Sequence, residues 1–213
     1  MRLLALDTCL NACSVALVRD DAVLSVASEP MSRGHQERLA LMVREVMAAA
    51  DAGFDSLDRI AVTLGPGSFT GLRVGLAFAK GLGAALSIPV IGVGTLEALA
   101  ASAPEAEEVA AIVGGKRGQA FLQIFRAGAA LSAPANVAVE ALEAALGPLG
   151  PQATLVGPGV DLLTALRPAA PSRRLEAADP AAIARLARTR APGGLSPLYL
   201  RAPDAKLPGG IDP

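Results

Sequence analysis

Few side chains in this sequence can do chemistry, and the first candidates are an aspartate and a threonine at the end of an apolar run. Asp7 and Thr8 directly follow Leu3-Leu-Ala-Leu6. A carboxylate at a strand end, followed by a hydroxyl in a tight turn, can hold the water shell of Mg²⁺ and a phosphate oxygen. An Asx or Ser/Thr turn that closes a hairpin explains the same dipeptide without any ligand. Both interpretations stay open.

A second candidate is the glycine-rich stretch Gly65-Pro-Gly-Ser-Phe-Thr-Gly-Leu-Arg73, which follows the apolar run Ile60–Leu64. This order predicts a strand, a glycine-rich turn and a helix that Ser68 or Thr70 caps. The free N–H groups of such a helix start favour anions. The stretch lacks the Gly-Lys-Thr ending of a phosphate-binding P-loop. We therefore expect at most a nucleotide or anion contact, at Asp7, Thr8, Gly65 and Ser68.

The predicted helix carries a stripe of small residues at Gly71, Gly75, Ala79 and Gly83. A glycine inside a helix costs roughly 1 kcal/mol relative to alanine, so another backbone is expected to approach closely along the stripe. It can belong to the same chain or to another chain, and the apolar residues on other faces favour another chain. On this prediction Gly75→Leu abolishes complex formation and leaves the lone chain folded. The predicted partner interface comprises Gly67, Thr70, Gly71, Arg73, Gly75, Phe78, Ala79, Leu82 and Gly83.

The remaining reactive side chains offer little. His35 is the only histidine, which excludes a His-pair metal site, and any Ser-His-Asp or Cys-His arrangement would have to use it. We interpret it as a polar residue in the first turn of a helix. Cys9 and Cys13 are poorly spaced for a disulfide, and Cys13 in a buried strand is expected to act as a small hydrophobe. We predict no catalytic residue and no metal site in this chain.

Composition excludes several other classes of protein. The 213 residues suffice for one or two domains, and the net charge of −1 does not favour a protein that binds nucleic acid alone. Residues 167–213 contain more Arg and Lys than Asp and Glu. We interpret this excess as a solvated face, with a contact to RNA or to an acidic partner as the alternative. No signal peptide and no membrane-spanning run is predicted. Unpaired cysteines fit a reducing compartment, so we expect a cytoplasmic protein.

Hydrophobic periodicity predicts one plan that occurs twice. A strand–strand–strand–helix–strand–helix order and its shorter echo indicate an α/β, duplicated ribonuclease-H-like fold in two lobes. Pro104 and the acidic residues after it mark a boundary, so we predict an N-terminal lobe at 1–104 and a smaller C-terminal lobe with an extended tail at 105–213. The strands are predicted at 1–7, 12–18, 22–28, 60–64, 88–93, 109–113, 119–125 and 153–156. The helices are predicted at 34–50, after residue 68, and at 96–101, 139–146, 162–166 and 180–190.

These motifs together resemble one protein family. The opening Leu3–Thr8 and Ala12–Leu17, the segment from Gly65 through Lys80 to Leu96, and the tail Pro197–Arg201 are similar to motifs of the TsaB (YeaZ) family of tRNA threonylcarbamoyladenosine biosynthesis proteins. The similarity is strong over residues 1–100 and faint from there to the tail. The nonamer that ends at Arg73 is the most specific part, because it is not a generic glycine loop.

The resemblance implies an actin/Hsp70/sugar-kinase-like fold with a reduced second lobe. It implies a part in adding threonylcarbamoyl to the adenosine next to the anticodon of tRNAs that read codons beginning with A. The resemblance implies that this chain is a non-catalytic subunit. A TsaD-type subunit catalyses the transfer, a TsaE-type ATPase joins the complex, and the chain alone forms a homodimer. The glycine-striped helix matches the family's interface. No intrinsic cofactor is implied, only ATP or ADP with Mg²⁺ at the subunit interface, and tRNA is bound through the complex.

One departure bears on nucleotide binding. A second-lobe strand of the family commonly ends in an Asp-Ala-Arg-like motif, whereas Gly114-Gly-Lys-Arg117 stands here without a carboxylate. This argues against an intrinsic ATPase. An independent nucleotide-dependent phosphotransferase or ATPase that uses Asp7 and Thr8 stays the alternative. A peptidase, a label that this superfamily has carried, lacks a metal cluster or a credible triad.

Overall fold

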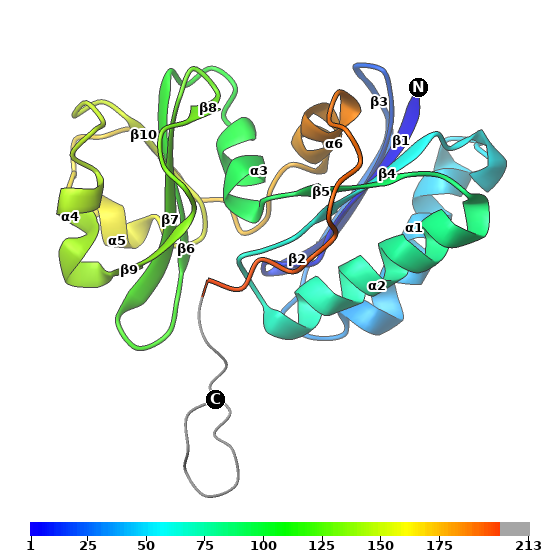
Figure 1. Cartoon of the computed structure of the whole chain (residues 1–213), viewed down its shortest axis with the longest axis horizontal. Helices are drawn as coiled ribbons and strands as arrows, with labels where there is room; N and C mark the ends of the chain where they lie inside the picture. Colours follow the sequence, from blue (N-terminus) through cyan, green and yellow to red (C-terminus); the bar gives the residue numbers. More distant parts are fainter. Residues whose placement is uncertain (201–213) are drawn as a thin grey trace, which may run out of the picture.

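The structure, a computed structural model, describes residues 1–200 and contains two β-sheets with helices between and outside them (Figure 1). The first sheet has the strand order β3-β2-β1-β4-β5. Its first three strands are antiparallel, and β4 and β5 run parallel to β1. Because helices cover both faces, β1 and β4 are apolar and buried along nearly their whole length. The strands are β1 (Arg2–Asp7), β2 (Ala12–Arg19), β3 (Ala22–Pro30), β4 (Arg59–Thr63) and β5 (Val90–Val93).

The second sheet repeats this plan in a shorter form. Its order is β11-β10-β6-β7-β8, and β9 also pairs with β7. The antiparallel hairpin β6–β7 and the parallel neighbour β10 correspond to β1, β2 and β4. The predicted duplicated α/β fold of the actin/Hsp70/sugar-kinase type, with a reduced second lobe, is thereby confirmed. The strands are β6 (Glu108–Gly114), β7 (Gln119–Arg126), β8 (Ala129–Ala130), β9 (Ala135–Ala138), β10 (Thr154–Val156) and β11 (Ser172–Arg173).

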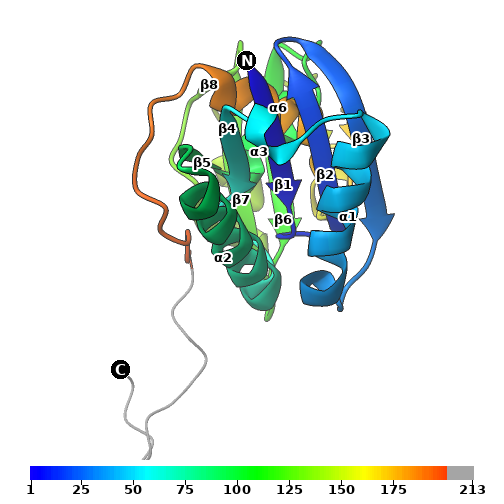
Figure 2. The ribbon, with the colours of Figure 1, turned by 90° about the vertical axis from the view of Figure 1, so that its right-hand side faces the viewer.

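Helices cover the sheets in three groups. Figure 2 shows α1 and α2 side by side over one face of the first sheet. Between the two sheets lie α3 and α6, and their apolar side chains join those of both sheets in one core. The short helices α4 and α5 pack on the outer face of the second sheet. The helices are α1 (His35–Ala49), α2 (Phe69–Leu86), α3 (Thr95–Ala101), α4 (Leu142–Ala145), α5 (Asp161–Thr164) and α6 (Pro180–Arg188), with 3₁₀ turns η1 (Phe54–Ser56) and η2 (Val139–Ala141).

The predicted lobe boundary at residue 104 separates the two sheets, but the second lobe does not contain everything that follows. The α6 helix packs against β1, β2, β4 and β5 of the first sheet. Beyond it, Arg59 Nη1 donates to the Arg190 carbonyl at 2.8 Å, and Leu198 N donates to the Leu64 carbonyl at 2.7 Å. Residues 180–200 therefore return to the first lobe. No helix within residues 1–200 is long and apolar enough to cross a membrane.

Candidate functional site

The glycine-rich turn between β4 and α2 forms as the sequence predicts. Ser68 is the N-cap of α2, and its Oγ accepts a hydrogen bond from Gly71 N at 3.2 Å. Ser68 N in turn donates to the Cys9 carbonyl at 2.7 Å. The start of α2 is thereby fixed directly on the loop between β1 and β2.

The glycine stripe of α2 faces this chain's own first sheet. A Cβ on Gly71 would lie 2.0 Å from the Thr8 carbonyl oxygen, and one on Gly75 would lie 2.4 Å from Thr8 Oγ1. At the far end, a Cβ on Gly83 would lie 2.4 Å from a Val90 methyl group. The close approach expected of these glycines exists, but the backbone that approaches is part of the same chain. The predicted effect of Gly75→Leu is corrected accordingly: leucine would collide with Thr8 and disturb the fold.

The residues predicted for a partner interface thus fall on different sides of α2. Thr70 and Arg73 are exposed, and Phe78 and Leu82 are half-buried in the flanks of the helix. Gly67 is half-buried in the preceding turn, where its Cβ would lie 2.1 Å from the Cys9 carbonyl oxygen. The remaining members, which lie buried against the sheet and have no outward surface, are Gly71, Gly75, Ala79 and Gly83.

A second stripe of small residues lies on the outward face of α2. Ala77, Gly81 and Ala84 are exposed, and a Cβ on Gly81 would meet nothing within 4 Å among residues 1–200 outside its own stretch of helix. The neighbouring helix α1 adds an exposed face that includes Leu41, which is 51% exposed. The sequence shows the spacing of this stripe, but not that it points outward. We call the combined face the α1–α2 surface, consisting of Ala40, Leu41, Arg44, Ala48, Thr70, Arg73, Ala77, Gly81 and Ala84.

The residues predicted to contact a nucleotide are mostly enclosed. Asp7 is 0% exposed and Thr8 is 1% exposed. Asp7 Oδ1 accepts hydrogen bonds from Thr63 Oγ1 at 2.7 Å and from Cys9 N at 2.9 Å, and Thr8 Oγ1 donates to the Gly71 carbonyl at 2.7 Å. Gly65 is buried too, whereas Ser68 is exposed. Asp7 and Thr8 therefore do not fit a nucleotide with its Mg²⁺ in this arrangement, and no chemical step is assigned to such a group.

Burial also changes the acidity of Asp7. Loss of solvent raises the pKa of its carboxyl above the ordinary 3.8, although the hydrogen bonds from Thr63 and Cys9 oppose this. Asp7 Oδ2 has no hydrogen-bond partner among the described residues. The folded chain thus binds this proton more tightly than the unfolded chain does.

We expect Asp7→Asn to stabilise the protein near neutral pH. The stability contributed by protonated Asp7 is fully present below the unfolded pKa and is lost as pH rises through the folded pKa. Asparagine is uncharged at every pH in this range, and its Oδ1 can still accept the hydrogen bonds from Thr63 and Cys9. Melting temperatures of wild type and variant, measured from pH 3 to pH 8, should diverge as pH rises. A variant that is less stable than wild type at pH 7 would contradict the expected cost of the buried charge.

The other reactive groups are also interior. Burial raises the pKa of the Cys9 thiol to about 12 and that of Cys13 to about 11, so both thiols stay neutral at pH 7. His35 is buried at the start of α1, and its Nε2 has no hydrogen-bond partner among the described residues. The N-cap of α3 is Gly94, and the helix itself begins at Thr95. Within residues 1–200, no group of three His, Cys, Asp or Glu side chains is placed to hold a metal ion.

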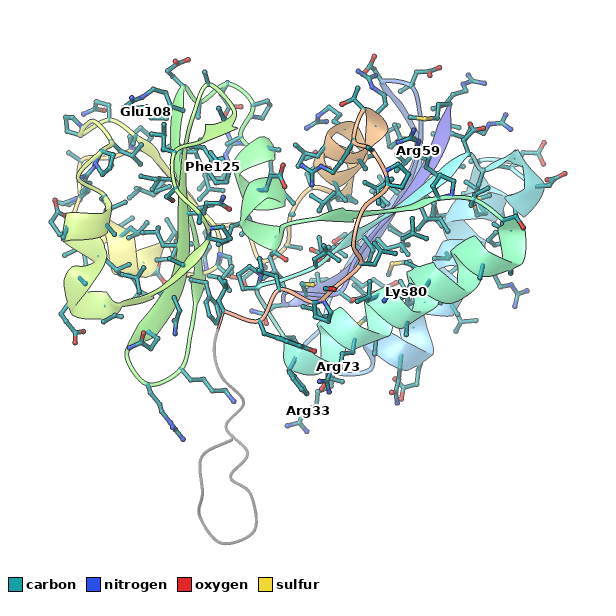
Figure 3. The ribbon with its side chains drawn as sticks, viewed as in Figure 1. Arg33, Arg59, Arg73, Lys80, Glu108 and Phe125 are labelled. Carbon is teal, nitrogen blue, oxygen red and sulfur yellow. The ribbon has the colours of Figure 1, made fainter. Side chains whose placement is uncertain are left out.

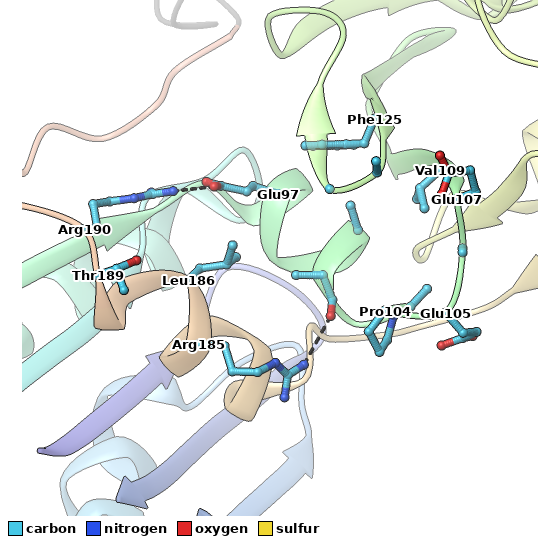
Figure 4. Close-up of a pocket in the computed structure, with 16 residues that line it drawn as sticks. Glu97, Pro104, Glu105, Glu107, Val109, Phe125, Arg185, Leu186, Thr189 and Arg190 are labelled. Atoms are coloured by element: carbon cyan, nitrogen blue, oxygen red, sulfur yellow. Dashed lines mark hydrogen bonds and ion pairs between the residues drawn. The ribbon is translucent and has the colours of Figure 1, made fainter. Parts of the chain in front are cut away.

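A cavity of about 670 Å³ opens between α3, α6, the strands β6 and β7 and the turn that follows β7 (Figure 4). Both arginines in its lining are already engaged: Arg190 is paired with Glu97, and Arg185 Nη2 donates to the Ala101 carbonyl at 3.3 Å. None of the predicted nucleotide contacts lines it. The cavity is therefore separate from the loop that holds Asp7 and Thr8.

Comparisons with known proteins agree with this architecture. The family model of TsaD, tRNA N6-adenosine threonylcarbamoyltransferase, matches residues 26–160. The Escherichia coli tRNA threonylcarbamoyladenosine biosynthesis protein TsaB is 40% identical over 103 residues, which cover 48% of this chain and 44% of that protein. An uncharacterized protein of Mycobacterium tuberculosis is 34% identical over 206 residues, or 95% of this chain and 93% of that one. The chain spans about half the length of the curated TsaB relatives that it matches.

Solved structures extend the similarity over the whole fold. YeaZ from Pseudomonas aeruginosa aligns with a TM-score of 0.75 at 31% identity, covering 93% of this chain and 99% of that one. With 93% of this chain covered, the similarity extends into both lobes. The chain therefore belongs to the TsaB (YeaZ) family.

Proposed function

We propose that this chain is a non-catalytic, activating subunit of the machinery that adds threonylcarbamoyl to the adenosine next to the anticodon of tRNAs reading codons beginning with A. It docks a TsaD-type catalytic subunit through the α1–α2 surface. Family membership supports the pathway, because the curated relatives are named for it. The interior position of Asp7, Cys9 and His35 supports a non-catalytic role, since none of these groups reaches a substrate from solvent.

Gly81 is the observation that carries the docking proposal. A glycine inside a helix costs roughly 1 kcal/mol relative to alanine. The buried glycines of α2 offset this cost by packing on Thr8 and Val90, but a Cβ on Gly81 would meet no other part of the described chain within 4 Å. Gly81 has no side chain, and Ala77 and Ala84 on the same face have small ones. Another helix can therefore pack here so closely that the two backbones nearly touch. We infer that this helix belongs to the partner, and to a second copy of the chain when the partner is absent.

The remaining parts of the proposal rest on the resemblance alone. A TsaE-type ATPase joins the pair, tRNA binds through the assembled complex, and ATP or ADP with Mg²⁺ binds at the subunit interface. From this chain, the exposed Ser68 at the start of α2 is the predicted contact that can face such a nucleotide, because Asp7, Thr8 and Gly65 are buried.

Association with a TsaD-type protein of the same organism tests the function. We expect size-exclusion chromatography with light scattering to give a homodimer of the chain alone and a 1:1 heterodimer after mixing. Threonylcarbamoylation of tRNA in a reconstituted reaction should then depend on both chains. If no heterodimer forms, and the pure chain hydrolyses ATP in a manner abolished by Asp7→Ala, the phosphotransferase alternative is correct.

A further inference from the structure

Three side chains form an exposed stack where the C-terminal segment crosses the start of α2. The Arg73 guanidinium carbon lies 3.6 Å from the centre of the Phe69 ring and 5.7 Å from that of Tyr199. The two ring centres are 5.5 Å apart. Phe69 is 52% exposed and Tyr199 is 47% exposed. The chain has only five phenylalanines and one tyrosine, yet two of these rings stand together at the surface.

This stack holds the Arg73 guanidinium in one orientation. Arg73 Nε donates to the Tyr199 hydroxyl at 2.9 Å, and the Phe69 ring supports the flat face of the group. Both Nη atoms have no partner among residues 1–200. A guanidinium fixed by stacking loses little conformational entropy when its free edge binds, and that edge matches the two oxygens of a carboxylate.

The charges around the stack favour an acidic ligand. Besides Arg73, α2 carries Lys80 and no Asp or Glu, and Figure 3 marks both cations along the helix. Arg73 is also on the α1–α2 surface, three residues from Thr70 and four from Ala77. The small, apolar character of that surface fits a protein helix better than the phosphates of RNA, which need a concentrated basic face.

We propose that the free edge of Arg73 is a preformed receptor for one carboxylate of the partner subunit. Tyr199 acts as its positioning residue: its ring and hydroxyl hold the guanidinium, while the C-terminal segment is itself fixed to the first lobe by the bond from Leu198 N to the Leu64 carbonyl. The identity of the partner rests on the proposed function; the need for a carboxylate and for Tyr199 goes beyond it.

Binding measurements on the full chain test this receptor. We expect Arg73→Lys, which keeps the charge but loses the planar fork, to weaken binding to the TsaD-type partner about tenfold by isothermal titration calorimetry. Tyr199→Phe should weaken it about threefold, since one hydrogen bond is lost and the ring stays. The matched control is Lys116→Ala, which removes a cation from the exposed β6–β7 turn and should change affinity less than about twofold. Affinity of the wild type should fall more steeply with salt than that of Arg73→Ala.

A double-mutant cycle identifies the carboxylate. Each exposed Asp or Glu of the partner is changed to Asn or Gln and measured against wild type and Arg73→Lys. At one position the two changes together should cost no more than one alone. The receptor is refuted if no acidic position couples to Arg73, or if Arg73→Lys lowers the affinity of the complex for tRNA while leaving the protein–protein affinity unchanged.

The same measurements separate this inference from the proposed function. Ala77→Arg lies on the α1–α2 surface but outside the stack, and it should abolish binding if that surface docks the partner. Loss of binding in Ala77→Arg with normal binding in Arg73→Lys and Tyr199→Phe refutes the receptor and keeps the docking role. Normal binding in Ala77→Arg, or no binding by the wild type, refutes the docking role and with it the assignment of the carboxylate to this partner.

Discussion

Two glycine-to-alanine changes in α2 should move stability in opposite directions. We expect Gly71→Ala to destabilise the chain by about 3 kcal/mol, because the new Cβ would lie 2.0 Å from the Thr8 carbonyl oxygen and must push α2 away from the first sheet. Gly81→Ala should stabilise it by about 1 kcal/mol, since its Cβ enters open space and alanine is the better helix former. Urea unfolding followed by circular dichroism measures both.

The pair is its own control, since the substitution, the helix and the change in size are the same. For a chain of this length, 1 kcal/mol corresponds to a melting-temperature shift of about 3 °C. The two variants should therefore melt roughly 12 °C apart. Equal shifts in both variants would mean that the outward and inward faces of α2 are assigned wrongly.

Gly81→Leu should leave the chain folded and remove its association with a TsaD-type partner. The leucine side chain has room beside the described residues 1–200, of which none outside the same stretch of helix lies within 4 Å of the Cβ position. In the complex, where the two helices are proposed to pack with their backbones nearly touching, the leucine side chain would push the helices apart and expose the neighbouring apolar residues. We expect affinity to fall at least about 100-fold, which corresponds to about 3 kcal/mol. Calorimetric titration gives the affinity, and the melting temperature confirms the fold.

Its control is a leucine placed at an exposed alanine outside the α1–α2 surface. Ala129 lies in the short exposed strand β8 of the second lobe, and Ala129→Leu should bind the partner as the wild type does. Full affinity in Gly81→Leu would show that the outward stripe of α2 is solvated in the complex. The docking role would then need a different face of the molecule.

The sequence predicts much of the fold because its strongest patterns are local. The buried runs at β1, β2, β4 and β6, and the cap at Ser68, each follow from neighbouring residues. The short strands β8, β9 and β11 are not predicted, because they have too few residues to show a pattern and form only by pairing with β7 and β10. The helix at 180–190 is predicted, but the return of residues 180–200 to the first sheet is not, because it depends on the packing of α6 against that sheet.

The sequence by itself determined the family, the duplicated plan and the presence of a helix built for close packing. Only the tertiary structure decided which neighbours that helix has. The spacing puts Gly81 on a different face of the helix from Gly71 and Gly75, but it does not tell which of the two faces meets the sheet. The loop at Thr8 is more than sixty residues away in sequence, yet it fills one face of α2, and the C-terminal segment places Tyr199 against Arg73. Long-range contacts of this kind are set by the packing of whole elements, and they decide which face remains for a partner.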